Sequence, residues 1–214
     1  MIISLSGIDA GGKGVQTERL RQHLTKRGIV AEAMHFPVYE SVTGREIKRF
    51  LTGEVKLSVG DDSPLDRIVA TLAKAVTLQA LMTANRLEHL DRLFADEHTH
   101  DSVLICDRYT ACAVAYGMAD GLERAFIDKL NETLPIPHLA ILIDITVDES
   151  WKRRPKRDDQ YEANRGRLER VRQNYLDYFD GHGARSIVDG MRPPEAVAAD
   201  IARIVDDVIE FYGE

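Results

Sequence analysis

Cysteine is scarce in this chain, with only Cys106 and Cys112 among its 214 residues. The two lie close together at the end of one predicted strand, which argues against a disulfide framework and predicts free thiols in a reducing compartment. Clusters of metal-ligand residues are missing as well. His98 and His100 form the only tight histidine pair, and their polar surroundings predict a solvated loop rather than metal ligands. The core must therefore stabilise the fold without disulfides or a structural metal.

An excess of positive charge is also missing. The formal net charge is −7 at pH 7 and the pI is about 5.5, so a basic face for a nucleic-acid polymer is not expected. No apolar run approaches the length of a membrane span, and no basic stretch leads into a signal-type core at the N-terminus. We therefore expect a cytoplasmic protein whose partners include neither a nucleic-acid polymer nor a membrane.

The most informative segment is a glycine-rich loop near the N-terminus. Residues 6–14 read Ser-Gly-Ile-Asp-Ala-Gly-Gly-Lys-Gly, between an apolar run at 1–5 and a helical pattern at 15–26 that uses Val15, Leu20 and Leu24. In such a loop backbone N–H groups surround phosphate oxygens, and Lys13 neutralises their charge. The loop predicts a nucleotide-binding protein. Gly14 stands where a serine or threonine is usual, which leaves the metal chemistry open.

The rest of the chain alternates between strand and helix patterns over a length that suits one compact α/β domain. Helix patterns cover 41–51, 64 to about 94 and 194–211, and Ser63 and Pro64 form the start of the second. Short apolar runs predict strands at 29–36, 102–106, 139–144 and 184–188. Asp107 and Arg108 directly follow one of these runs. Because parallel sheets bind ligands at the carboxyl ends of their strands, we expect both residues near a site.

Four further segments accompany the loop in a definite order. They are Phe36-Pro37-Val38-Tyr39, Asn85-Arg86, the stretch from Asp107 to Tyr116, and a basic stretch at 152–157 followed by Tyr161 and Glu162. With the loop, they resemble the thymidylate kinase family. The resemblance implies a P-loop nucleoside monophosphate kinase-like fold, in which a five-stranded parallel sheet is flanked by helices in three α/β layers. It implies a single kinase domain over 1–214 with a basic lid at about 150–160, and a homodimer.

The activity implied is magnesium-dependent transfer of a phosphoryl group from ATP to dTMP. Such a transfer needs positioned cations rather than a covalent nucleophile. Lys13, Arg108 and Arg153 are the predicted charge-stabilising residues, with Asp9 organising metal and acceptor and Asp107 holding a metal-bound water. The plainer interpretations stay open: a helix-capping aspartate, a surface ion pair that closes a strand, and a solvated basic loop.

The two substrate sites follow from the same resemblance. The predicted ATP-binding residues are Gly7, Ile8, Asp9, Ala10, Gly11, Gly12, Lys13, Gly14, Val15, Arg153, Arg157 and Arg192, although a simple turn also explains Arg192. The predicted dTMP-binding residues are Asp9, Phe36, Pro37, Tyr39, Leu51, Met82, Arg86, Arg108, Cys112, Tyr116 and Tyr161.

Several acceptor-side positions carry specific expectations. The planar donor fork of Arg86 suits a pyrimidine carbonyl, and Tyr116 is expected to crowd the sugar 2′ position. Met82 stands where the family has an aromatic residue that stacks on the base, while Cys112 and Ala113 replace polar residues. These departures leave open a kinase for another or a modified deoxypyrimidine monophosphate. Core packing also explains Met82 and Tyr116, and a surface position explains Arg86.

A different class of protein also stays open. Gly14 and Val15 leave no hydroxyl group directly after Lys13. A catalytically weak, nucleotide-binding regulatory protein would explain this feature.

Overall fold

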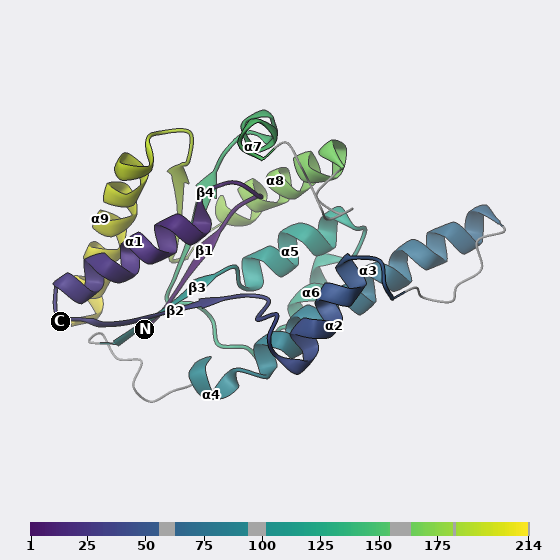
Figure 1. The fold of residues 1–214 in the computed structure, drawn as a ribbon, viewed down its shortest axis with the longest axis horizontal. Helices are drawn as coiled ribbons and strands as arrows, with labels where there is room; N and C mark the ends of the chain where they lie inside the picture. Colours follow the sequence, from purple (N-terminus) through teal and green to yellow (C-terminus); the bar gives the residue numbers. More distant parts are fainter. Residues whose placement is uncertain (56–62, 94–101, 155–163, 182, 214) are drawn as a thin grey trace.

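The sheet at the centre of the molecule is parallel throughout. In this computed structural model, which describes residues 1–55, 63–93, 102–154, 164–181 and 183–213, its strands are β1 (Ile2–Ser6), β2 (Val30–His35), β3 (Ser102–Asp107), β4 (Leu139–Asp144) and β5 (Arg185–Asp189). Their order is β2-β3-β1-β4-β5, with β1 in the middle (Figure 1). The predicted five-stranded parallel sheet is confirmed.

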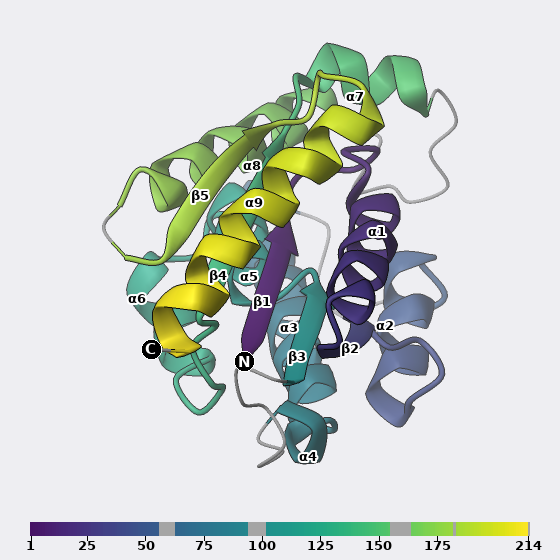
Figure 2. The ribbon, with the colours of Figure 1, turned by 90° about the vertical axis from the view of Figure 1, so that its left-hand side faces the viewer.

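Helices cover both faces of this sheet. They are α1 (Lys13–Lys26), α2 (Val42–Leu51), α3 (Pro64–Leu87), α4 (Leu90–Leu93), α5 (Thr110–Ala119), α6 (Arg124–Leu130), α7 (Val147–Arg153), α8 (Arg165–Phe179) and α9 (Pro194–Gly213). Figure 2 views the sheet from the face that α1 and α9 cover. On the opposite face, α5 and α8 pack against each other and against β4. The predicted three-layer α/β arrangement follows from these contacts.

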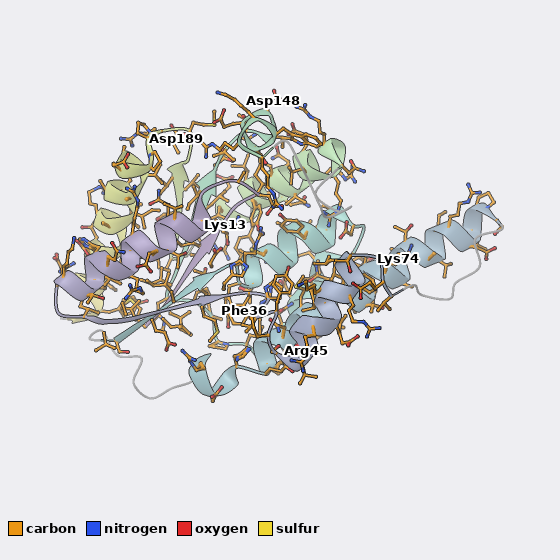
Figure 3. All side chains as sticks on the ribbon, viewed as in Figure 1. Lys13, Phe36, Arg45, Lys74, Asp148 and Asp189 are labelled. Atoms are coloured by element: carbon orange, nitrogen blue, oxygen red, sulfur yellow. The ribbon has the colours of Figure 1, made fainter. Side chains whose placement is uncertain are left out.

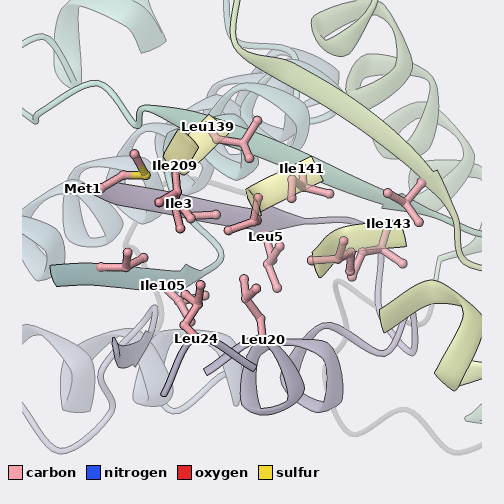
Figure 4. Close-up of a cluster of buried hydrophobic side chains, with 14 of the residues drawn as sticks. Met1, Ile3, Leu5, Leu20, Leu24, Ile105, Leu139, Ile141, Ile143 and Ile209 are labelled. Carbon is pink, nitrogen blue, oxygen red and sulfur yellow. The ribbon is translucent and has the colours of Figure 1, made fainter. Parts of the chain in front are cut away.

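The core beneath α1 and α9 explains why the strands are continuous apolar runs. Ile3, Leu5, Ile105, Ile141 and other strand side chains meet Leu20 and Leu24 of α1 and the apolar side of α9 (Figure 4). A strand covered on both faces needs apolar residues at every position. Val15, which belongs to the helical pattern at 15–26, is 54% exposed and takes no part in this core.

The helix predicted from 64 to about 94 is shorter than expected. Its start is as predicted, since the Ser63 hydroxyl accepts from the Asp66 N–H, the Asp66 carboxylate accepts from the Ser63 N–H, and Pro64 begins the helix. It ends at Leu87, and Glu88 is the C-cap residue, whose N–H still donates to the Ala84 carbonyl oxygen. The Glu88 carboxylate accepts from the N–H and the hydroxyl of Thr43, at the start of α2. Phe94, the predicted end, lies outside the described residues.

The expectation that no apolar segment approaches the length of a membrane span needs correction at α3. Its 24 residues, with mean hydropathy 1.2 in the most apolar window, are long and apolar enough to cross a membrane by length and composition alone. A core helix of a soluble protein passes the same test. Helix α3 packs on α2, α5 and α6 and carries Gln79, Asn85 and Arg86 as buried polar residues. These buried polar residues interrupt the apolar sequence of α3 in the half of the helix that packs on the rest of the protein.

Sequence patterns missed α5, α6, α7 and α8. Helix α5 has small and apolar residues on every side, including Ala111, Ala113 and Ala115, because it is buried between α8 and α3. A helix that is buried all round carries no amphipathic period from which it can be predicted.

Two glycines in first helical turns give a test of the packing that supports the loop after β2. A Cβ on Gly44 of α2 would lie 1.8 Å from the Val38 carbonyl oxygen, whereas a Cβ on Gly166 of α8 would meet only the Asn164 side chain at 3.6 Å. We expect Gly44→Ala to lower the free energy of unfolding by about 3 kcal/mol. We expect Gly166→Ala to leave it unchanged or to raise it by up to about 1 kcal/mol. Urea unfolding of both variants checks the pair, and equal stabilities would contradict it.

Candidate functional site

The glycine-rich loop joins β1 to α1 and has a backbone that larger residues cannot adopt. Gly7 has φ 145°, and a Cβ there would lie 2.5 Å from the Ile143 carbonyl oxygen of β4. Gly12 has φ 87° and forms the N-cap of α1 without a side-chain cap. Gly7 is therefore required by close approach and by its backbone conformation, and Gly12 by its left-handed backbone alone. The first N–H groups of α1 point into the loop without a capping side chain, which suits an anion.

Lys13 lies at the first position of α1 and curls back over the loop. Its Nζ donates to the Ile8 carbonyl oxygen at 3.0 Å, and the residue is 6% exposed. Burial lowers the pKa of Lys13, and Arg108 lowers it further, while Asp9 and Asp107 act in the opposite direction. In Figure 3, Lys13 is labelled at the start of α1 and Phe36 on the side towards α2 and α3.

Asp9 in the loop and Arg108 after β3 form a partly buried ion pair. The Arg108 Nη2 donates to Asp9 Oδ1, and the Tyr116 hydroxyl lies 3.5 Å from Asp9 Oδ2. Arg108 has φ 68°, a left-handed conformation that is rare for arginine. Burial disfavours the charge of Arg108, but Asp9 outweighs this and the pKa of Arg108 lies well above its usual value. The Ser150 hydroxyl holds the Asp9 carbonyl at 2.6 Å.

Asp107, the last residue of β3, lies on the other side of the loop. Its Oδ2 pairs with His35 Nδ1 at 3.1 Å, and its buried Oδ1 has no hydrogen-bond partner among the described residues. Burial works to raise the pKa of Asp107, but the hydrogen bond from His35 and the charges of Lys13 and Arg108 bring it below the usual value. A Cβ on Gly14 would lie 3.6 Å from Asp107 Oδ2. Position 14 therefore faces a carboxylate, and a small side chain fits there.

A cavity of about 630 Å³ opens beside Asp9 and Arg108. It is enclosed by the loop after β2 and by α2, α3 and α5. Among its lining residues are all the predicted acceptor-binding residues that the structure describes: Asp9, Phe36, Pro37, Tyr39, Leu51, Met82, Arg86, Arg108, Cys112 and Tyr116. Tyr161 lies outside the described residues. Segments that are far apart in the sequence thus meet in one hollow next to the glycine-rich loop.

Arg86 is the most firmly held cation of this cavity. It is 3% exposed, its Nη2 donates to the Tyr109 carbonyl oxygen at 3.1 Å, and its Nη1 approaches Asn131 Oδ1 at 3.4 Å. Its Nε has no partner among the described residues. Burial lowers the pKa of Arg86. The plain alternative of a surface arginine is wrong for this residue.

The α5 wall of the cavity offers few free polar groups. Cys112 Sγ accepts from the Tyr175 hydroxyl at 2.9 Å, and Ala113 has none to offer. Burial raises the pKa of Tyr116 well above its usual value, and its ring lies within 5.8 Å of the Arg108 guanidinium carbon. Cys106 and Cys112 are both free and buried, as predicted.

Asn85 organises the loop at the other side of the cavity. It is fully buried, its Oδ1 accepts from the Val38 N–H at 2.8 Å, and its Nδ2 donates to the Val38 carbonyl, the Ser41 hydroxyl and the Thr43 hydroxyl. The loop carrying Pro37 and Tyr39 is thereby tied to α3, next to Arg86.

Two arginines at the end of α7 point to different parts of the site. Arg153 turns towards the glycine-rich loop, where it donates to the carbonyl oxygens of Ala10 and Gly190 at 3.3 Å and 2.9 Å and to Glu149 at 2.9 Å. Arg154 lines the cavity instead. Arg157 lies outside the described residues, as do most residues of the predicted lid. His98 and His100 lie outside them too.

Two predicted ATP-binding residues lie away from these contacts. Val15 is exposed, and Arg192 pairs with Asp200 of α9. Sequence reasoning also missed six polar residues that line the cavity: His35, Lys48, Thr52, Gln79, Arg154 and Arg167. Arg154 lay within the predicted lid but was not singled out. Helical spacing relates Gln79 to Met82 and Arg86, so this position carried a usable signal.

Comparison with known proteins gives a consistent result. The family described as thymidylate kinase matches residues 5–201. A probable thymidylate kinase from Pyrococcus horikoshii is 31% identical over 205 residues, covering 95% of this chain and 94% of that protein. A thymidylate kinase from Symbiobacterium thermophilum is 29% identical, covering 98% and 94%. The structure of thymidylate kinase from Candida albicans shares the fold, with a TM-score of 0.76 and 23% identity over 96% and 91% of the two chains.

Proposed function

Because the chain belongs to the thymidylate kinase family, we propose that it is a phosphotransferase that uses ATP to convert dTMP to dTDP. One structural observation supports this proposal independently of the family match. The partly buried Asp9–Arg108 pair joins the glycine-rich loop to a cavity of about 630 Å³ lined by further cations. A donor phosphate on the loop and an acceptor phosphate in the cavity would therefore meet at Arg108.

The proposed mechanism assigns a role to each cation. Lys13 leaves the Ile8 carbonyl to bind the β and γ phosphates of ATP, in the field of the α1 N-terminus. Arg108 bridges the acceptor phosphate and the transferred phosphoryl group, and Asp9 fixes the position of its guanidinium. Arg153 lies against the loop carbonyl of Ala10 and balances charge on the donor side. In-line transfer then needs positioning and charge stabilisation only.

The acceptor site has the size and polarity for a deoxypyrimidine monophosphate. Arg86 presents an unpartnered Nε and a fixed donor fork, which suits a base carbonyl. Met82 and Phe36 supply apolar surface for the ring, and Tyr116 supplies bulk near the sugar. The remaining proposed contacts come from Pro37, Tyr39, Leu51, Cys112 and Tyr161 for dTMP, and from the loop residues, Arg157 and Arg192 for ATP.

The first test is turnover. With ATP, dTMP and magnesium at neutral pH, we expect ADP and dTDP to form in equal amounts. Lys13→Ala should lower kcat by roughly 10²–10³, the usual loss for one charge-stabilising donor. Lys26→Ala, at the other end of α1, serves as the control and should keep full activity. Formation of no more ADP by the wild-type protein than by Lys13→Ala would contradict the proposal.

We propose magnesium as the metal, held mainly by water and phosphate oxygens. Asp107 fits this role, because its buried Oδ1 has no partner among the described residues and its carboxylate faces position 14. Asp9 fits less well as a direct ligand, since Arg108 and Tyr116 engage its oxygens. The part of the chain that is described holds no cluster of ligands for a tightly bound ion. Magnesium keeps several waters and needs few protein ligands.

Position 14 gives a test of the magnesium proposal. Gly14→Ser adds a hydroxyl beside Asp107 without a clash, because the new Cβ would lie 3.6 Å from the carboxylate. We expect this variant to bind Mg²⁺ in the ADP complex more tightly by roughly fivefold, the equivalent of about 1 kcal/mol. Gly14→Ala adds the Cβ alone and should not change the affinity. Titration calorimetry measures both, and equal affinities would show that the missing hydroxyl has no effect on the metal.

We also propose that the chain is a single cytoplasmic kinase domain that forms a homodimer. Leu65, Ile68, Val69, Leu72 and Val76 are exposed by 39–67% on α3. Their spacing of three and four residues makes one apolar stripe along the half of the helix that extends beyond the body in Figure 1. A second copy brings an identical stripe, so a two-fold interface between the two helices buries both.

Oligomeric state tests the stripe directly. Sedimentation at tens of micromolar should give about twice the chain mass of 24.0 kDa. Val69→Glu should give the single-chain mass, because a charge cannot be buried in an apolar interface without a partner. Val30→Glu changes an exposed valine on β2 and should remain dimeric. A wild-type protein that sediments as a monomer would rule out the interface.

A further inference from the structure

The cavity contains one buried amide that the roles above do not use. Gln79 of α3 lines the cavity and is 4% exposed. Its enclosed Oε1 has no hydrogen-bond partner among the described residues. Buried polar atoms are nearly always paired, because an unpaired one loses its hydration without compensation. An unpaired amide on the wall of a substrate cavity therefore indicates a group that the substrate pairs.

The position of Gln79 is built into the packing of α3 against α5. Gln79, Met82 and Arg86 follow one another at spacings of three and four residues, so they share one face of α3. Across from this face, a Cβ on Gly117 of α5 would lie 3.1 Å from Gln79 Nε2. A glycine at this position leaves the room that the amide occupies. The side chain thus lies between the two helices whose residues form the walls of the cavity.

The chemistry of a thymine ring calls for an acceptor at this place. Its outer edge presents the N3–H donor between two carbonyl acceptors. The Arg86 guanidinium has donors only, so it serves a carbonyl and not the N3–H. On the α5 wall, Cys112 Sγ already accepts from the Tyr175 hydroxyl, and Ala113 has no polar atom. An amide offers both an acceptor and a donor, and rotation about its last bond turns either end towards the base.

We propose that Gln79 recognises the imide edge of the acceptor base. Its Oε1 accepts from N3–H and its Nε2 donates to a neighbouring carbonyl, while Arg86 binds the base from two helical turns further along the same face of α3. The inference rests on the proposed function, since it concerns the same cavity and the same class of substrate. Near Ala113, α5 has no free polar side chain to recognise the base. Gln79 supplies this recognition from α3 instead.

The experiment compares two substrates and two proteins. The substrates are dTMP and N3-methyl-dTMP, which lacks the N3–H donor. The wild-type protein should use dTMP with a kcat/KM at least roughly tenfold higher. In Gln79→Leu, kcat/KM for dTMP should fall by a similar factor, and the ratio between the two substrates should approach one. Gln173→Leu, which removes an exposed amide on α8, is the control and should keep the wild-type ratio.

The outcomes separate this inference from the proposed function. Absence of dTMP turnover in the wild-type protein would overturn the function itself. Turnover with a wild-type ratio close to one, or with a large ratio that persists in Gln79→Leu, would overturn only the role of Gln79.

Thermal unfolding distinguishes recognition from a structural role. Without ligand, Gln79→Leu should unfold at the wild-type temperature or above, because it removes an unpaired polar atom, while the rise in Tm that dTMP causes should shrink. A lower Tm without ligand together with an unchanged substrate ratio would assign Gln79 to packing. Gln79→Met, with an unbranched chain of similar length, gives the same measurements if the leucine variant does not fold.

Discussion

The ion pair between Asp9 and Arg108 is the interaction on which the arrangement of this site depends. Asp9 belongs to the loop after β1 and Arg108 follows β3, so the pair joins the carboxyl ends of two neighbouring strands. Arg108 reaches Asp9 from a left-handed backbone conformation that costs free energy and persists only when its surroundings fix it. Tyr116 and Ser150 supply that support from α5 and α7. The loop and the cavity are thereby held in one fixed relation.

Charge is distributed unevenly over the molecule. The chain carries a net charge of −7, yet the described residues that line the cavity include Lys48, Arg86, Arg108, Arg154 and Arg167, with Asp9 as the one acidic residue among those described. An acidic surface with a basic hollow directs small anions to the hollow and repels polyanions elsewhere. The net charge predicted that the protein has no basic face for a polymer. The structure adds that several of its basic side chains line one cavity.

The sequence predicted much of the fold, because buried parallel strands and capped helices leave local signals. The five strands, the start of α3 at Ser63 and the loop before α1 are of this kind. Tertiary contacts decided the remainder. The residue after α3, Glu88, is bound by Thr43 of α2, and uniform burial hides α5. The family resemblance predicted ten of the residues that line the cavity. Gln79 could have been added from its helical spacing to Met82 and Arg86, whereas the place of Arg154 in the cavity is visible only in the folded chain.

The four hydrogen bonds of Asn85 have a consequence for how the acceptor is bound. They join the loop that carries Pro37 and Tyr39 to the helix that carries Arg86, through a side chain with no exposed surface. The two walls of the cavity are thus joined to each other in the absence of a bound nucleotide. The loop is therefore ordered when the protein folds rather than when a nucleotide binds. The free energy of acceptor binding then does not include the entropic cost of ordering the loop.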